Sequence, residues 1–233
     1  MSTLRLSHIL HKVTDLHGAV ADAEAAGFTV HWGSDPGHAH NALVWFETGP
    51  FLELYAAPPF DEAKASLFES AAGPGSVIRS RRWGAVDDGW CDYAVETDEP
   101  DLSAVVARCR EAGIALGPAF HPSRTLPGGD TVTWDLAFPD DADLPFVMSA
   151  YSSPQRPSAV RHDNGATEIT SITVTHPDPD RHREELARYV GSSTLDGVIV
   201  EPGDAPGMVV GAVSATGLTE PAAFGASTVI PAG

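Results

Sequence analysis

Apolar and polar positions in the first quarter of the chain predict strands around one helix. Residues 7–13 are rich in apolar side chains, and Asp15 then precedes an Ala-rich stretch that Gly27 ends. An Asp before the first turn and a Gly after the last are typical helix boundaries. Three further runs are rich in aromatic and β-branched residues, at 28–33, 41–49 and 50–57. The pattern therefore predicts the order strand, helix, strand, strand, strand.

The same order returns in residues 88–153. A strand pattern at 88–98 is followed by a helical pattern at 99–113, which carries Val105, Val106 and Cys109 on one side. Asp98 and Gly113 take the places of Asp15 and Gly27 in this second unit. Strand patterns follow at 114–120, 131–139 and 144–153, and a polar, Gly-rich stretch from 59 to 82, with a helical pattern at 60–73, separates the two units.

A third, partial copy follows a polar linker at 155–167. Its patterns are a strand at 169–176, a helix at 178–191, strands at 197–202 and 207–215, and a weak strand at Ser227–Ile230. Internal repetition of this kind is the strongest structural signal in the sequence. We therefore expect an α+β protein of repeated βαβββ modules, with a paired domain at 1–155 and a partial module at 156–233.

Composition and charge narrow the choice of partners. The chain has 233 residues, of which 42% are hydrophobic, with 14 Lys and Arg against 32 Asp and Glu, for a formal net charge of −18. Such a charge repels nucleic acids and anionic membrane surfaces. No signal peptide and no long apolar run are found, which predicts a cytoplasmic protein with Cys91 and Cys109 reduced. The expected partner is a small molecule.

Glu53 is the most unusual residue in these patterns. It stands in the middle of the apolar run FLELY, which reads as a buried strand. An ionised carboxylate is costly in such surroundings unless it is paired, hydrogen-bonded or bound to a metal. Glu53 therefore needs a partner.

Several motifs resemble those of a known superfamily. The first strand carries His8, the loop at 33–40 is rich in Gly, His and Pro, Asn41 begins the third strand, and Leu-Glu-Leu around Glu53 lies in the fourth. In this order they resemble the vicinal oxygen chelate superfamily of glyoxalases, bleomycin-resistance proteins and extradiol dioxygenases, and more narrowly its glyoxalase-like members. The resemblance covers about residues 5 to 155.

The resemblance implies an open, cup-like barrel of paired modules with a divalent metal ion on its concave face. His8 matches the first-strand ligand and Glu53 the fourth-strand ligand, so Glu53 finds a candidate partner in His8. One imidazole and one carboxylate suit Fe, Mn, Ni or Zn, with open positions for substrate oxygens. Such a metal acts as a Lewis acid. Proteins of this build often pair, which makes a homodimer an expectation.

The second module departs from the superfamily's pattern. Aligning Asp98 with Asp15 sets Cys91 opposite His8, and aligning the final strands sets Ser149, or Met148, opposite Glu53. Neither Ser nor Met is a usual ligand for these metals. The expected ligand set is therefore His8 and Glu53, completed by Cys91 or by a histidine of the loop, His40 or His38.

Three hypotheses remain open. In the first, which we favour, the protein is a metal-assisted lyase, isomerase or dioxygenase with His8 and Glu53 as catalytic ligands. In the second, His8 or His11 and Glu53 act as base and acid without a metal. In the third, the cup only binds or sequesters a small molecule, or assists its cyclisation. The predicted substrate contacts are Asn41, Trp45, Trp90, Trp134 and Ser149, and Tyr93 is a further aromatic residue that could line the cup.

Two charged segments give weaker signals than the His8 and Glu53 motifs. The stretch Arg79–Trp83 (RSRRW) concentrates positive charge, which could receive an anionic group of a ligand. The helix around His182 carries Arg and Glu at helical spacing, which is typical of a solvated face with ion pairs along the helix.

Overall fold

The first sheet of the computed structural model begins with the predicted βαβββ unit. The model describes residues 3–56, 61–205 and 207–233; the predicted strand end at Ala57 and helix start at Phe60 lie outside them. The Asp15 side chain accepts a hydrogen bond from the Gly18 amide (3.1 Å), which caps the helix as the sequence predicted. The elements are β1 (Arg5–Lys12), α1 (Leu16–Ala25), β2 (His31–Trp32), β3 (Asn41–Val44) and β4 (Phe51–Tyr55).

The second unit is similar but has a longer connection to its helix and an inserted hairpin. Its elements are β5 (Gly89–Glu96), α4 (Ser103–Glu111), β6 (Ser123–Thr125), β7 (Thr131–Thr133), β8 (Leu136–Ala137) and β9 (Phe146–Met148). The predicted strand at 114–120 forms only isolated bridges at Leu116 and Phe120. Two helices, α2 (Glu62–Ala72) and α3 (Pro74–Ala85), connect the units.

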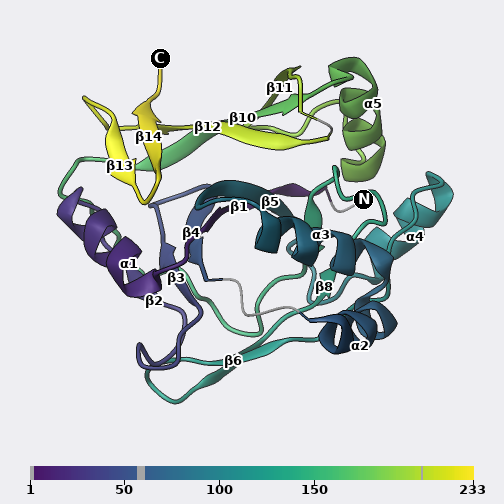
Figure 1. The fold of residues 1–233 in the computed structure, drawn as a ribbon, viewed down its shortest axis with the longest axis horizontal. Helices are drawn as coiled ribbons and strands as arrows, with labels where there is room; N and C mark the ends of the chain where they lie inside the picture. Colours follow the sequence, from purple (N-terminus) through teal and green to yellow (C-terminus); the bar gives the residue numbers. More distant parts are fainter. Residues whose placement is uncertain (1–2, 57–60, 206) are drawn as a thin grey trace.

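Both units contribute to one curved sheet of seven strands, in the order β2-β3-β4-β1-β5-β9-β8 (Figure 1). The antiparallel pair of β1 and β5 joins the units at the centre, with β4 parallel to β1 and β9 parallel to β5. The β6–β7 hairpin pairs only with itself and lies across the open side of this sheet. The predicted α+β fold of repeated modules is confirmed.

The C-terminal segment forms a second sheet, whose strand order matches that of five strands in the first sheet. Its elements are β10 (Glu168–His176), α5 (Pro179–Val190), β11 (Val198–Pro202), β12 (Val209–Thr216), β13 (Ala222–Phe224) and β14 (Ser227–Pro231). The order β11-β10-β12-β14-β13 has the same sequence of parallel and antiparallel pairs as β4-β1-β5-β9-β8 in the first sheet. This sheet therefore repeats the centre of both N-terminal units in shortened form.

Apolar side chains fill the space between the two sheets. Ile9 and Tyr93 from the first sheet share one fully buried cluster with Ile172 and Val213 from the second. Successive residues of a strand face opposite sides, so a residue on the far side of Ile9 faces the concave side of the first sheet. The core therefore fixes which side chains of β1 are available to a cavity.

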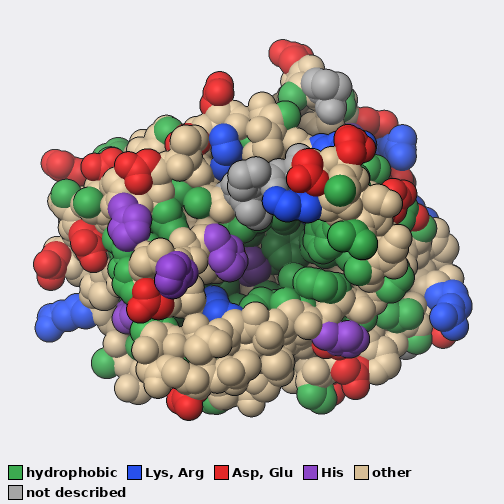
Figure 2. All heavy atoms as spheres, turned by 60° about the horizontal axis from the view of Figure 1, so that its bottom comes forward, with side chains coloured by type: hydrophobic (Ala, Val, Ile, Leu, Met, Phe, Trp, Pro, Cys, Tyr) green, Lys and Arg blue, Asp and Glu red, His purple; other side chains and the backbone are tan. Residues whose placement is uncertain are grey.

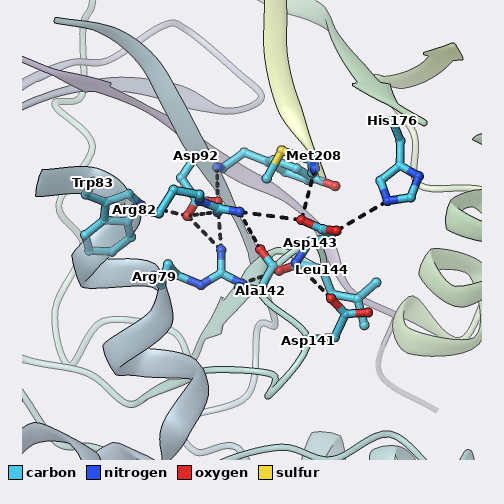
Figure 3. A network of polar contacts seen from close by, with 11 residues as sticks. Arg79, Arg82, Trp83, Asp92, Asp141, Ala142, Asp143, Leu144, His176 and Met208 are labelled. Carbon is cyan, nitrogen blue, oxygen red and sulfur yellow. Dashed lines mark hydrogen bonds and ion pairs between the residues drawn. The ribbon is translucent and has the colours of Figure 1, made fainter. Parts of the chain in front are cut away.

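A buried carboxylate binds α3 to the first sheet (Figure 3). Asp92 of β5 accepts hydrogen bonds from Arg79 (2.7 and 2.8 Å), from Arg82 (2.8 Å) and from the Trp83 indole (2.8 Å). The three donors are spaced to lie on one side of the helix. Burial alone raises the pKa of Asp92, but the charges of Arg79 and Arg82 outweigh it and hold the pKa below its usual value. Two arginines of the Arg79–Trp83 segment, Arg79 and Arg82, thus stabilise the packing of α3 on the first sheet.

The same network reaches the C-terminal sheet. Arg82 lies 3.7 Å from Asp143, which also accepts from the Met208 amide (2.9 Å) and lies 3.3 Å from His176 Nε2. His176 stacks on His182 of α5 with ring centres 4.8 Å apart. His182 is 1% exposed, so the expected solvated face of α5 is wrong at this residue. Its ion pairs, such as Arg181 with Glu185, are present.

None of the helices in the described ranges has the length and apolar character needed to cross a membrane. The edge strands are β2 and β8 in the first sheet and β11 and β13 in the second. Compartment and homodimer formation stay predictions.

Replacing Arg79 by Met should lower the free energy of unfolding by about 3–5 kcal/mol, because it leaves the buried Asp92 with too little positive charge. Urea denaturation at pH 7 measures this. Arg81→Met, which changes an exposed arginine paired with Glu62, is the matched control and should stay within about 0.5 kcal/mol. The difference between Arg79→Met and wild type should shrink below pH about 4, where Asp92 becomes protonated in the unfolded chain. Equal stability of Arg79→Met and Arg81→Met would contradict this role.

Candidate active site

A cavity of about 360 Å³ opens on the concave side of the first sheet. Its walls come from β1, β3, β4, β9, the two connecting helices and the β6–β7 hairpin. Figure 2 shows the hollow, with hydrophobic side chains in its depth and histidines beside its opening. The volume suits a small molecule. Aromatic residues dominate the lining: Tyr55, Phe68, Trp83, Phe120, Trp134, Phe138, Phe146 and Tyr151.

His8 and Glu53 meet at the wall of this cavity. In the parallel pairing of β1 with β4, His8 lies opposite Phe51 and Leu10 lies opposite Glu53. This register brings the side chains of His8 and Glu53 to the same face, where His8 Nε2 lies 3.3 Å from Glu53 Oε2. Glu53 Oε1 accepts a hydrogen bond from the Asn41 side chain on β3 (2.8 Å). Glu53 therefore has the partner that its apolar surroundings require.

The His8 ring is held in one orientation. It stacks on Phe51 with ring centres 4.6 Å apart, and the Phe146 ring packs at 5.4 Å. Ser7 Oγ donates to Glu96 (2.7 Å) and lies 3.1 Å from His8 Nδ1. Because the single hydroxyl proton of Ser7 is used for Glu96, Nδ1 is the donor in its contact with Ser7. The lone pair of neutral His8 is then on Nε2, which faces Glu53.

Burial shifts the pKa of each member of the pair toward its uncharged form. Burial lowers the pKa of His8 to about 3, because an imidazolium would lose its hydration. Burial also raises the pKa of Glu53, although the Asn41 hydrogen bond and the charge of Arg124 work against this shift. The distance alone would permit an ion pair, but both pKa shifts oppose the charged forms.

The corresponding positions of the second unit carry no metal ligands. On β5 and β9, Ala94 lies opposite Phe146 as His8 lies opposite Phe51, and Met148 follows where Glu53 follows in the first unit. The counterpart of His8 is therefore Ala94, and the predicted alignment with Cys91 is wrong by three residues. The reason is local: residues 13–15 connect β1 to α1, whereas residues 97–102, three more, connect β5 to α4.

The other two predicted ligands lie apart from the pair. His40 is exposed at the mouth of the cavity, with its ring 6.3 Å from that of Tyr55. Cys91 is buried in an apolar cluster with Leu10 and Trp83, and it is not itself among the lining residues. Burial raises the pKa of the Cys91 thiol, and the neighbouring charge of Asp92 adds to this effect, so the thiol stays protonated.

The predicted substrate contacts divide into two groups. Asn41 and Trp134 line the cavity. Trp45 instead packs behind Phe51 (4.2 Å between ring centres), and Trp90 stacks on Phe224 of the C-terminal sheet (5.3 Å).

Two more of the predicted residues have structural positions. Ser149 is fully buried and uses its hydroxyl on the backbone, accepting from the Asp135 amide (2.9 Å). Tyr93 belongs to the core between the sheets. His11, like Trp90, faces the second sheet and packs against Phe224 (5.5 Å), which leaves His8 as the β1 histidine of the cavity.

The donor set does not fit a metal centre built by the protein. Within the described ranges, no three His, Cys, Asp or Glu side chains come together in a way that could hold a metal ion. His8 and Glu53 supply two possible ligand atoms, which face each other. Their counterparts in the second unit are Ala94, which has no ligand atom, and Met148, whose thioether is too soft for Mn²⁺, Fe²⁺ or Zn²⁺ in such a site.

Arg124 is a cavity residue that the sequence patterns did not reveal. It lies on β6 and reaches the cavity beside Trp134 and Tyr151, with its guanidinium 5.7 and 5.8 Å from their ring centres. Its charge lowers the pKa of His8 and of Glu53, although less than burial changes each, so it acts on the pair. The usable signal was the turn LPGGD between two Thr-containing runs, which is typical of a hairpin.

Comparison with known proteins gives the family. The model of the glyoxalase-like domain matches residues 6–190, which is well over half of the chain, and the chain belongs to this family. The resemblance to the vicinal oxygen chelate superfamily is thereby confirmed. No curated protein sequence matches the chain.

Solved structures share the fold at low sequence identity. A hypothetical protein from Staphylococcus aureus is 13% identical, with 94% of each chain covered and a TM-score of 0.64. The Mn(II)-bound glyoxalase from Novosphingobium aromaticivorans is also 13% identical, with 92% of this chain and 66% of that chain covered and a TM-score of 0.55. A catechol 2,3-dioxygenase is 11% identical, with 92% and 75% covered and a TM-score of 0.49. At these identities the likeness extends to the fold alone.

Both cysteines should be inert in the folded protein, because their thiols are buried and their pKa values are raised. At pH 8, Ellman's reagent should label neither Cys91 nor Cys109 within the time in which it labels both in guanidinium chloride. Cys91→Ser serves as the control that separates the two thiols. Rapid labelling of native Cys91 would show a reactive thiolate and would return this residue to the candidate ligands.

Proposed function

We propose that the protein is a small-molecule enzyme that moves a proton at a carbon next to a carbonyl group, in the manner of an isomerase or a lyase. The observation that carries the proposal is the pair of His8 Nε2 and Glu53 Oε2, 3.3 Å apart at the wall of a largely aromatic cavity. Because the donor set does not fit a metal centre, the chemistry is assigned to the pair itself. This replaces the metal-assisted hypothesis as the leading one.

The proposed step is balanced within the pair. His8 Nε2 takes the proton from the substrate carbon, and the electron pair of the broken C–H bond forms a carbon–carbon double bond. The carbonyl oxygen takes the Glu53 proton. The products are a neutral enol, an imidazolium and a carboxylate. Return of a proton to a different face or carbon completes an isomerisation, and departure of a β-substituent completes an elimination.

The site suits this change because no net charge appears in the cavity. Isolated ions are costly in apolar surroundings, but the imidazolium and the carboxylate form side by side. The Asn41 hydrogen bond to Glu53 Oε1 favours the ionised carboxylate, and the Ser7 contact holds the Nδ1 proton of His8 toward Glu96. The stack on Phe51 keeps Nε2 aimed at the cavity.

Exchange of substrate hydrogen for deuterium in D₂O tests the step without knowledge of the later products. We expect the protein to accelerate exchange at the acidic carbon of at least one of hydroxyacetone, phenylacetaldehyde and phenylpyruvate, followed by proton NMR. His8→Asn and Glu53→Gln should each lower the enzymatic rate by about 10²–10⁴-fold, the usual contribution of a general acid or base. His121→Asn, a change at an exposed histidine outside the cavity, is the control and should leave the rate unchanged.

Metal dependence separates this proposal from its rivals. Incubation with Mn²⁺, Fe²⁺, Ni²⁺ or Zn²⁺ followed by gel filtration should leave less than about 0.1 equivalent of bound metal, because two facing donors hold a cation weakly. Treatment with EDTA should not change the exchange rate. Loss of exchange on chelation with recovery on adding one of these ions would favour the metal-assisted enzyme. Absence of exchange with every compound would favour a protein that only binds its ligand.

A further inference from the structure

Arg124 is the one Lys or Arg side chain among the described residues that line the cavity. The chain carries 32 acidic residues against 14 basic ones, yet no Asp or Glu in the described ranges forms an ion pair with Arg124. The contrast with Arg79 and Arg82, which share Asp92, is clear. A partly buried cation without a counter-ion is unfavourable, so a ligand that supplies the anion would stabilise it.

The guanidinium is held in place by neutral groups. It lies 5.7 Å from the Trp134 ring centre and 5.8 Å from that of Tyr151, and one terminal nitrogen donates to the Gln155 side chain (3.2 Å). These contacts orient the group and leave its charge uncompensated. Arg124 Nε is buried and has no acceptor.

We infer that the cavity selects small carboxylates and that Arg124 receives the carboxylate group. The two oxygens of a carboxylate match two neighbouring N–H groups of a guanidinium, here those of its terminal nitrogens, and would supply the missing counter-charge. Because Arg124, His8 and Glu53 line one cavity, the carboxylate and the reacting carbon belong to one small molecule. Only the assignment of the reacting end rests on the proposed function.

The remainder of the ligand should be apolar and is best an aromatic ring. Besides the polar groups, the cavity is lined by apolar aromatic side chains that include Phe68, Trp83, Phe120 and Phe138. A volume of about 360 Å³ accommodates one ring with a short side chain. The inferred class is therefore an aryl-substituted short-chain acid with a carbonyl near the carboxylate.

Binding of charged and uncharged analogues tests the inference. The probes are benzoate, phenylacetate and 3-phenylpropionate, each beside its primary amide, titrated at pH 7.5 with ligand-detected NMR. At least one acid should bind wild type roughly tenfold or more tightly than its amide, because only the acid forms the charge-assisted pair with the guanidinium. Arg124→Gln should remove this preference, and Arg124→Lys should keep part of it. Arg81→Gln, which changes an exposed arginine, should keep all of it.

The outcomes separate the two proposals. His8→Asn and Glu53→Gln should still bind the acid, so lost exchange with retained binding concerns the proposed reaction and not the carboxylate site. Near-ultraviolet circular dichroism checks that Arg124→Gln is folded. If it is not, Arg124→Lys takes its place: a reduced preference for the acid supports the inference, and a full preference contradicts it. Equal binding of acid and amide, an unchanged preference in the folded Arg124 variant, or no binding of any acid by wild type overturns the inference.

Discussion

The arrangement of the cavity depends on one carboxylate that is fully removed from water. Asp92 on the central strand β5 collects Arg79, Arg82 and Trp83 from a single helix. Burying a charge in this way is tolerable only when every partner is present, so the contact has essentially one acceptable geometry. It places Trp83 in the cavity wall, and through Asp143 it connects the same helix to the C-terminal sheet. The wall is therefore held rigidly by a network that takes no part in the proposed chemistry.

The pair at the other wall follows a different principle. His8 and Glu53 lie together without a compensating cation as close as those of Asp92, and burial shifts the pKa of each toward its uncharged form. Asp92 stays ionised because two guanidinium groups surround it, whereas Glu53 has an amide and an imidazole. Two acids on one sheet thus have opposite pKa shifts for reasons visible in their neighbours. A proton that is easily exchanged is useful at a site of reaction, and a permanently charged group is useful as an anchor.

Much of the fold was predictable because its signals are local. The Asp15 cap and the apolar strand patterns act within a few residues, and the repetition of the unit is visible along the sequence. The pairing of His8 with Glu53 was expected from the resemblance to the superfamily. What failed depended on connection lengths and on distant partners. The three additional residues before α4 displaced the alignment from Ala94 to Cys91. The burial of His182 needed His176 from another element.

The cavity itself shows where sequence patterns stop being informative. Trp45, Trp90 and Trp134 look alike in sequence, but Trp45 packs behind Phe51, Trp90 stacks on Phe224 of the second sheet and Trp134 lines the cavity. Arg124 lies on a strand of only three residues that pairs with its own hairpin partner alone. Its importance comes from the aromatic and uncharged groups that surround it, which no local pattern encodes.

The repeated strand order of the two sheets explains why only one of them carries a cavity. In the first sheet, residues 56–88 connect β4 to β5 and residues 97–135 connect β5 to β8, and these long insertions supply the helices and the hairpin that enclose the concave side. In the second sheet the equivalent connections are only residues 203–208 and 217–221. The same order of five strands therefore borders a cavity in the first sheet, whereas in the second it packs against the first sheet. The capacity to hold a ligand therefore comes from the segments that connect the strands, because the strand order is the same in both sheets.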